Sequence, residues 1–575
     1  MTTMLKRVSL AFFACVFFAG AAFAEVILNR GNTDEPDTLD PHLAQGTWEN
    51  NIIGDMIIGL YTEDPEAKPI FGAAIGATTS PDGLVWTFTL RDHKWSDGVK
   101  VTADDFVYAW RRILDPKTGA QYASLLFDFK NARAINDGAM PPEALGARAI
   151  DDETLELTLE HPAPYLPQLM THYTTFPVPR HVVEKLGRDW VKPGNYVGNG
   201  PYIVVEWVPN DHIKSVKNPL FWDADKVQID TVYYYPTRDT SAALKRFRAG
   251  ELDMQNGLTA QDIVWIKQNI PDQVYLRPLL AISYVALNSS QPPLNDKDIR
   301  EALNLAFNRD TIATKVLKDY SEIAAYSLTP PGTAGTAGGA HVAFQSMSYG
   351  QRLARAKALM VKAGYGPDNH LKLAFEIGPS IDNKRDGAAI QQMWAPIYVD
   401  VDIHASESKV LYAALREGDF QTSQAAWVGD YNDAKNFLFL FRTDTKDMNY
   451  GRYSNPAFDQ LVDQSDHTAD AAERGKLLAQ AEQILLDDSA FIPNRFINTR
   501  YVVAPYVKGF VPNLRDINRT RWLSIEGRPG AVAGVPTGGS GPSVTTDEKG
   551  WLDRLWEWFA GLMCSWFGWF CTASS

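Results

Sequence analysis

Two kinds of hydrophobic spacing alternate along the chain. Apolar and polar residues take turns in residues 85–90 (VWTFTL) and 154–159 (TLELTL), which is typical of strands with one buried face. In residues 353–363 and 471–486 the apolar positions recur every three or four residues, as they do in amphipathic helices. The pattern therefore predicts a fold that mixes α-helices and β-strands.

The two ends of the chain depart from this mixture. Lys6 and Arg7 precede an apolar run at residues 8–19, and Ala-Phe-Ala follows at 22–24, which is the order of a secretory signal peptide. We expect residues 1–24 to be removed by cleavage near Ala24, in a protein exported to the periplasm. Toward the other end, residues 528–548 are rich in Gly, Pro and Ser and are predicted to form a flexible linker.

Beyond the linker, residues 549–575 are predicted to form an aromatic amphipathic helix. The sequence from Trp551 to Cys571 is crowded with Trp, Phe and Leu. A stripe of polar or small residues recurs at helical spacing: Asp553, Glu557, Gly561, Cys564 and Gly568. Such a helix could lie on a membrane surface, associate through its stripe, or span a bilayer, although the charges in its first turns make spanning costly. The sequence leaves these alternatives open.

Composition and charge narrow the class of protein. A chain of 575 residues exceeds what one hydrophobic core supports, so at least two lobes are expected. The formal net charge is −14 and no long basic stretch occurs, which argues against nucleic acid as a partner. The cysteines are Cys15, Cys564 and Cys571, so no disulfide is expected within residues 25–563. The last two could pair within the chain or between chains.

Short motifs occur in an order that is typical of one protein family. The densest stretch runs from WTFTLR at 86–91 through KWSDG at 94–98 to VTADDFVYAW at 101–110. Others are LDPH at 39–42, NIIGDMIIGLY at 51–61, NGPY at 199–202, GELD at 250–253, IREAL at 299–303 and NRD at 308–310. Over about residues 26–525 the chain resembles the oligopeptide-binding proteins of bacterial ABC importers. Thr102 is placed to cap a helix with acids in its first turn, so we assign these motifs to the fold and not to the ligand.

The resemblance implies a fold and a working arrangement. The fold is α/β, a periplasmic-binding-protein-like two-lobed fold (type II, cluster C) with an extra subdomain inserted in the first lobe. We place the first lobe at residues 25–275 with the insertion at about 58–185, the second lobe at 276–500, and a return to the first lobe at 501–527. A short peptide would bind in the cleft, hinge closure would bury it, and a monomeric body would deliver it to an inner-membrane ABC permease.

Trp427 and Asp430 are the ligand-binding residues that the resemblance indicates most specifically. In the family a Trp and, three residues later, an Asp lie on the cleft wall, and the Asp receives the peptide's α-ammonium group. Physically, a carboxylate beside an aromatic face suits a cation. From the residues alone, Asp430 could equally cap a turn.

Four further positions follow from the same resemblance. Tyr122 matches an aromatic residue of the smaller lobe that contacts bound peptide. Thr47 and Trp48 align with an extended segment whose backbone pairs with the peptide, and Asn256 falls in another stretch that faces the cleft. Because a peptide bound as an added strand satisfies its own amides, broad sequence specificity is expected.

The predicted carboxylate end of the cleft departs from the family. Several relatives meet the peptide carboxylate with an Arg and a His, where this sequence has Gln424 and Asn383. Either another cation, such as Lys384, Arg385 or Arg495, takes over, or the ligand is amidated, longer, or not an ordinary peptide.

Other functional classes have weaker support in the sequence. Asp430 and Asp433 could be drawn as the carboxylate pair of a secreted glycosidase, but we find no G-x-S-x-G, H-E-x-x-H or P-loop motif. We therefore predict a protein that is not an enzyme and that uses no cofactor or metal. A receptor for another solute, such as a muropeptide, an opine, a metal chelate or haem, stays an alternative because one scaffold can host different ligands.

Overall fold

The computed structural model describes residues 25–468 and 470–529. Residues 26–528, the body, form one compact unit. The predicted signal peptide and C-terminal helix, and nearly all of the predicted linker, lie outside the described residues. Within the described ranges, no helix combines the length and the apolar character that a membrane crossing requires.

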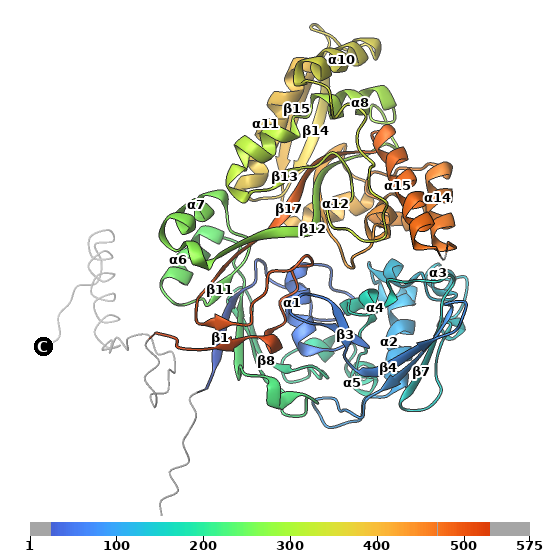
Figure 1. The fold of residues 1–575 in the computed structure, drawn as a ribbon, viewed down its shortest axis with the longest axis vertical. Helices are drawn as coiled ribbons and strands as arrows, with labels where there is room; N and C mark the ends of the chain where they lie inside the picture. Colours follow the sequence, from blue (N-terminus) through green and yellow to red (C-terminus); the bar gives the residue numbers. More distant parts are fainter. Residues whose placement is uncertain (1–24, 469, 530–575) are drawn as a thin grey trace, which may run out of the picture. The chain divides into compact units, whose positions relative to one another are not determined.

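One mixed sheet of eleven strands runs through the body (Figure 1). Its order is β15-β14-β16-β12-β17-β11-β1-β10-β9-β8, and β13 pairs with β17. In chain order these strands are β1 (Ile27–Gly31), β8 (Tyr202–Val208), β9 (His212–Lys217), β10 (Thr231–Tyr235), β11 (Met254–Gln255), β12 (Val274–Leu287), β13 (Ile323–Ala324), β14 (Leu371–Ile377), β15 (Val399–Ala405), β16 (Thr422–Val428) and β17 (Phe491–Val503). β1 is parallel to β10 and β11, and β14 is parallel to β15 and β16, whereas the other pairs are antiparallel.

The long strands β12 and β17 join two halves of the body (Figure 1). The first half contains β1 and β8 to β11, and the second half contains β13 to β16. The β12–β17 ladder breaks between Pro278 and Ile282, where proline has no N–H to donate and the backbone N–H of Leu280 bonds instead to the carbonyl of Leu514 at 2.7 Å. The predicted lobe boundaries at 275–276 and 500–501 fall inside these strands, and they stay predictions.

Two smaller sheets lie in the first half. β2 (Tyr61–Glu63) pairs with β3 (Pro69–Phe71), and a four-stranded sheet has the order β4 (Ala74–Thr79), β5 (Val85–Leu90), β7 (Thr154–Thr158) and β6 (Ala147–Ala149). The strands predicted at 85–90 and 154–159 are thus confirmed as β5 and β7. A further pair is β18 (Val507–Lys508) with β19 (Ser524–Ile525).

The KWSDG and VTADD motifs are explained by the start of helix α2 (Ala103–Leu114). The Asp105 carboxylate accepts the backbone N–H of Thr102 at 2.9 Å and the indole N–H of Trp95 at 3.3 Å. Thr102 is the N-cap, as predicted, and one buried acid fixes both the helix start and the preceding turn. These residues therefore act in the fold.

Helices cover both halves, and the two predicted from periodicity are confirmed. They are α10 (Tyr349–Lys362), capped by Ser348, and α15 (Ala471–Asp487), capped by Asp470. The other helices of the first half are α1 (Thr47–Met56), α3 (Ala132–Asn136), α4 (Leu166–Leu169), α5 (Arg180–Leu186), α6 (Thr240–Arg248) and α7 (Ala260–Asn269). Those of the second half are α8 (Lys297–Ala306), α9 (Arg309–Thr311), α11 (Ile381–Trp394), α12 (Ser408–Glu417), α13 (Lys435–Leu438) and α14 (Pro456–Asp466).

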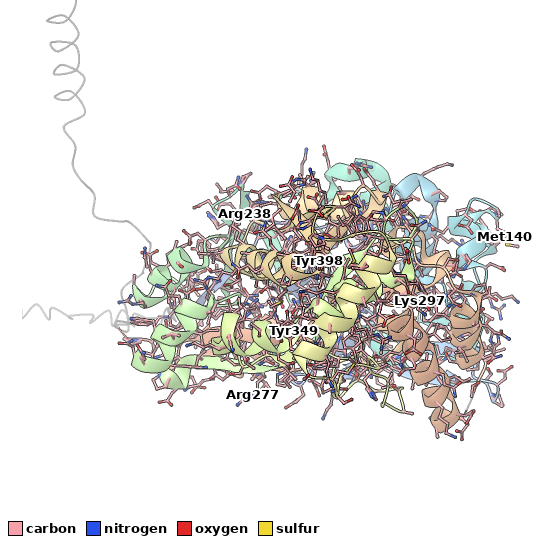
Figure 2. The ribbon with its side chains drawn as sticks, turned by 90° about the horizontal axis from the view of Figure 1, so that it is seen from above. Met140, Arg238, Arg277, Lys297, Tyr349 and Tyr398 are labelled. Atoms are coloured by element: carbon pink, nitrogen blue, oxygen red, sulfur yellow. The ribbon has the colours of Figure 1, made fainter. Side chains whose placement is uncertain are left out.

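Burial and exposure follow the usual division between large aromatic and charged side chains. Trp95, Trp110 and Trp394 have no exposed surface. Seen from above in Figure 2, charged side chains such as Arg238 and Lys297 point outward. Other charges are buried, since Asp55, Glu63 and Asp253 have no exposed surface.

Candidate functional site

Trp427 and Asp430 are held together by one amide side chain. Trp427 lies near the end of β16, paired with Ile282 of β12, so its backbone is fixed by the sheet. The Oδ1 atom of Asn436, on α13, accepts the Trp427 indole N–H at 3.0 Å and the Asp430 backbone N–H at 2.9 Å. The Asn436 amide nitrogen donates to Asp430 Oδ2 at 3.2 Å. The orientation of both predicted binding residues thus depends on Asn436.

The Asp430 carboxylate faces the first half of the body. Its Oδ1 atom lies 3.3 Å from Nε2 of His172, and the two side chains are 11% and 4% exposed. A carboxylate with so little access to water interacts strongly with any cation brought beside it. Asp430 therefore sits at a junction of the two halves, as the ligand-binding prediction requires.

Aromatic rings line the same junction. Tyr122, just before the short helix η2 (Ala123–Leu126), stacks between two partners. Its ring centroid lies 6.0 Å from that of His172 and 6.3 Å from that of Trp427, with interplanar angles of 18° and 8°. Burial, followed by the charge of Asp430, raises the pKa of Tyr122 well above its usual value, so the phenol is neutral. The structure thus brings Tyr122, Trp427 and Asp430 together across the two halves.

A buried arginine adds positive charge close to this group. Arg515 Nη1 donates to Thr171 Oγ1 at 2.8 Å, directly before His172. Glu63 lies 3.8 Å from Arg515 and 3.2 Å from Arg519, so one carboxylate serves two guanidinium groups. Burial lowers the pKa of Arg515, and Glu63 and Asp430 oppose that effect.

Asp433, three residues after Asp430, has a structural role. Its two carboxylate oxygens each accept a hydrogen bond from Arg474 at 2.8 Å, and both side chains are 6% exposed. Because this carboxylate is already engaged by a bidentate arginine, it does not form a free acid pair with Asp430. The hypothesis of a glycosidase-like carboxylate pair therefore has no support from Asp433.

Gln424 lies in a separate buried charge cluster of the second half. Its amide nitrogen is 3.4 Å from Asp386 Oδ2. Arg495 pairs with Asp386 at 2.6 Å and with Glu322 at 2.7 Å, and these three side chains are at most 10% exposed. Burial raises the pKa of Asp386, partly offset by Arg495. Arg495, one of the cations proposed to replace the missing clamp, is therefore already neutralised by two acids.

Asn383 lies near this cluster along the chain but not in it. Its backbone N–H donates to the Oγ atom of Ser380 in the first turn of α11 at 3.1 Å, and Asp386 follows one turn later on the same helix. Lys384 and Arg385 are exposed, and Arg385 lies 3.4 Å from Asp382. No contact of Asn383 with Gln424 is observed among the described residues.

The remaining predicted positions lie elsewhere. Asn256 follows β11 and is 8% exposed, with its Oδ1 atom lacking a protein hydrogen-bond partner. The expected extended conformation of Thr47 and Trp48 is wrong, because both belong to the first turn of α1. The Glu49 carboxylate accepts the backbone N–H of Gly46 at 2.8 Å, which closes that turn. Backbone pairing of a strand-like ligand at Thr47 and Trp48 therefore has no basis in this conformation.

Sequence reasoning missed three residues of the site: His172, Asn436 and Arg515. Their sequence neighbours carry no pattern that points to Asp430, and His172 precedes Asp430 by 258 positions in the sequence. Across the described ranges, no cluster of three or more His, Cys, Asp or Glu residues is arranged to hold a metal ion. What the junction offers is one carboxylate, flat aromatic walls and a buried cation.

The comparison with protein families decides the classification. The family model described as bacterial extracellular solute-binding proteins, family 5, middle part, matches residues 38–449. The chain belongs to this family. Among its relatives, the periplasmic oligopeptide-binding protein OppA of Escherichia coli is 37% identical over 499 residues, which cover 86% of this chain and 91% of that protein.

Solved structures of family 5 members agree with the fold. Haemophilus influenzae OppA in complex with RPPGFSPFR matches with a TM-score of 0.83 and 35% identity, covering 87% of this chain and 99% of that one. The murein tripeptide-binding protein MppA of Escherichia coli matches with a TM-score of 0.84 and 35% identity, covering 87% and 98%. The predicted two-lobed, type II periplasmic-binding-protein-like fold is confirmed.

A second MppA structure bears on how the lobes are arranged. Against the unliganded open form of that protein the TM-score falls to 0.66, at 34% identity and with coverage of 88% and 99%. Both are structures of MppA and one is named as the open form, so the lower TM-score indicates a different placement of the lobes. The lobes of this family 5 chain are arranged less like the open form than like the other MppA structure.

Proposed function

We propose that the protein is a periplasmic receptor that captures short peptides between its lobes and delivers them to an ABC importer of the inner membrane. Support comes from family membership, from the names of its periplasmic peptide-binding relatives, and above all from Asp430. A poorly hydrated carboxylate lies between two lobes, against the parallel rings of Trp427 and Tyr122. This arrangement suits the α-ammonium group of a peptide, by ion pairing and by cation–π attraction.

Affinity is expected to depend on this ammonium more than on side-chain sequence. Replacing one member of a buried charge pair costs about 3–5 kcal/mol, which is roughly a hundredfold to several thousandfold in affinity. We assign Asp430 as the residue that receives the ammonium, Trp427 and Tyr122 as the walls beside it, and Asn436 as the residue that positions Trp427 and Asp430. Asn256, Gln424 and Asn383 are proposed to line more distant parts of the cleft.

A cycle of one mutation and one chemical change tests this assignment. Calorimetry would compare wild type and Asp430→Asn, each with a peptide and with its N-acetylated form. We expect each single change to weaken binding by about a hundredfold or more, and the two together to cost little beyond either one, because both remove the same pair. Asp419→Asn, an exposed acid before β16, is the matched control and should bind normally. Additive losses would contradict the ammonium contact, and unchanged binding by Asp430→Asn would overturn the peptide assignment.

A murein-type peptide is the second candidate for the cargo. MppA, which is a murein peptide-binding protein by name, is 35% identical over 527 residues. Arg495 is paired with two acids, so it does not distinguish the two ligands by their carboxylates. Competition between a muropeptide and an unmodified tripeptide would separate the two candidates.

Export and membrane contact are the less specific parts of the proposal. We infer that residues 1–24 direct export and leave after Ala24, and that residues 549–575 bring a monomeric body to the membrane surface, where Trp and Phe favour the interface. Fractionation without detergent of the full mature chain, beside a variant in which Trp551, Trp556 and Trp558 are replaced by Ser, tests the second point. Equal recovery of both in the soluble fraction would contradict membrane contact.

A further inference from the structure

A second contact between the lobes lies away from Asp430 and consists of charged and aromatic groups. Its members, the interlobe charge cluster, are Asp128, His161, Tyr165, Lys435 and Asp466. The first three come from the first half and the last two from the second half. Lys435 is the first residue of α13, and Asp466 is the last residue of α14.

Lys435 is the centre of the cluster. Its Nζ atom lies 2.9 Å from Asp128 Oδ1, 2.9 Å from the Tyr165 hydroxyl oxygen and 2.9 Å from Asp466 Oδ1. The Tyr165 hydroxyl in turn donates to Asp128 Oδ2 at 2.8 Å. The ammonium group thus donates hydrogen bonds to two acceptors of the opposite half, Asp128 and Tyr165, and forms an ion pair with Asp466 of its own half.

Tyr165 also inserts its ring into the second half. The ring stacks on Tyr431 with centroids 4.8 Å apart and an interplanar angle of 12°. The guanidinium carbon of Arg474 lies 5.4 Å from the Tyr165 ring centroid, and Lys435 Nζ lies 5.5 Å from it. Such packing of a ring between a second ring and two cations is favourable in itself.

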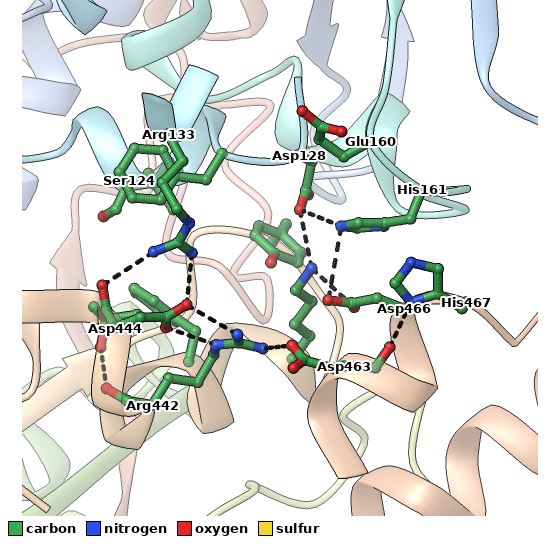
Figure 3. Close-up of a pocket in the computed structure, with 16 residues that line it drawn as sticks. Ser124, Asp128, Arg133, Glu160, His161, Arg442, Asp444, Asp463, Asp466 and His467 are labelled. Atoms are coloured by element: carbon green, nitrogen blue, oxygen red, sulfur yellow. Dashed lines mark hydrogen bonds and ion pairs between the residues drawn. The ribbon is translucent and has the colours of Figure 1, made fainter. Parts of the chain in front are cut away.

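Further contacts surround the cluster, and a cavity of about 290 Å³ borders it. Arg133 of the first half lies 3.0 Å from Asp444 Oδ2 and donates to the Asp444 carbonyl at 3.1 Å. His161 Nε2 lies 3.1 Å from Asp128 and 3.7 Å from Asp466, and Figure 3 shows these groups converging on the cavity. Every one of these contacts is made between residues of the protein, with no need for cargo.

The charge pair at the centre persists over a wide range of pH. Burial opposes ionisation of Asp128, but Lys435 and His161 outweigh it and hold the pKa of Asp128 well below its usual value. Burial likewise opposes the charge of Lys435, whereas Asp128 and Asp466 raise the pKa of Lys435 above its usual value. Both groups are therefore ionised throughout about pH 5–9.

We propose that the interlobe charge cluster is a latch that stabilises the closed arrangement of the lobes independently of cargo. Opening separates Lys435 from Asp128 and Tyr165, and leaves Asp466 as its remaining partner. Close charge pairs across interfaces show coupling energies that correspond to factors of ten and far more. The latch sets how often the cleft is open to receive a ligand, and a cargo-free population of closed protein follows. It rests on the proposed function only in that a two-lobed receptor must open to load.

Distance measurements on cargo-free protein test the latch. The body has no cysteine, so Met140→Cys in the first half and Val361→Cys in the second, both exposed, can carry spin labels in the full mature chain with Cys564→Ser and Cys571→Ser. Met140 lies at the outer edge of the body in Figure 2. We expect one predominant short distance in the parent chain, and a rise of at least tenfold in the open-to-closed ratio for Asp128→Asn and for Lys435→Gln.

Three further variants make the test specific. Tyr165→Phe keeps the stacked ring and both charges, and should raise the ratio by about threefold to tenfold, since it removes the two hydrogen bonds of the hydroxyl. Combining Asp128→Asn with Lys435→Gln should add little to either single change. Glu156→Gln removes an acid that pairs with Arg148 inside the first half at 2.7 Å, and should leave the distances unchanged.

Two outcomes would overturn the latch: a parent chain that is predominantly open without cargo, or unchanged distances in folded Asp128→Asn and Lys435→Gln proteins. The measurement uses no peptide, so its failure is distinct from failure of the Asp430 assignment. Opening of the lobes in Asp128→Asn would support the latch even if Asp430→Asn bound peptide normally.

Discussion

Two acidic side chains of the second lobe with little exposure, one just after β16 and the other on α11, have opposite surroundings. Asp430, after β16, contacts His172 and Asn436, whereas the nearby Arg515 lies 3.8 Å from Glu63. Asp386, beside Gln424, is paired directly with Arg495, which is also paired with Glu322. The first acid is poised for an added cation, whereas the second already has one. A buried charge therefore does not by itself identify a binding residue. Whether the charge is already paired within the protein is the more useful criterion.

The largest effect is expected on stability, from removing the arginine that pairs with Asp386 and Glu322. Arg495→Met leaves Asp386 and Glu322 buried without a cation, which should lower the free energy of unfolding by about 3–5 kcal/mol. Urea denaturation followed by tryptophan fluorescence measures this change. Arg385→Met, which removes an exposed arginine from the same lobe, should cost about 0–1 kcal/mol. An Arg495→Met protein of normal stability that loses only peptides with a free carboxylate would reverse the comparison.

A smaller effect is expected from the aromatic wall beside Asp430. Tyr122→Ala removes the ring between His172 and Trp427 and should weaken peptide binding by roughly tenfold, because stacking and lost contact area together amount to about 1–2 kcal/mol. Titration calorimetry measures the affinity. Tyr122→Phe keeps the ring and should bind as wild type does. Equal binding by Tyr122→Ala would remove the aromatic wall from the proposed site.

The smallest effect is expected from the ligand's far end. Amidation of the peptide carboxyl terminus should change affinity by no more than about fivefold, the range of a solvent-exposed ion pair, because Arg495 is occupied and position 424 is a glutamine. Competition between the free acid and the amide measures the difference. A hundredfold preference for the free acid would show that another cation meets the carboxylate.

The elements that the sequence predicted are those whose spacing is set locally. β5 and β7 each have one face on a core and one toward water, and α10 and α15 carry an apolar stripe with a capping residue, so their periodicity is visible. The second part of β12 is buried on both faces and alternates little, which hides the strands that join the lobes. The start of α1 had a readable signal, since Glu49 stands at the position that closes a capping box.

The candidate site could be predicted only in part. Trp427, Asp430 and Tyr122 were identified through the resemblance, because a short motif fixes their positions in the chain. His172 and Arg515 come near Asp430 only when distant segments of the chain fold together. A local sequence pattern therefore cannot predict that they lie there. The ion pairs of Arg495 with Glu322 and Asp386 could not be predicted either, because the three residues come from separate segments of the chain.

Substitutions at positions 436 and 424 are expected to have different consequences for ligand binding. One side-chain amide orients both the indole and the carboxylate that we assign to capture, so drift at position 436 disturbs two recognition elements at once. The Gln424 side chain donates a long hydrogen bond of 3.4 Å to Asp386, and it makes no hydrogen bond with Trp427 or Asp430 among the described residues, so we expect substitutions at position 424 to leave those two residues in place. During evolution, such a receptor can therefore change its specificity for the carboxyl-terminal end of the ligand while it keeps the same recognition of the α-ammonium end.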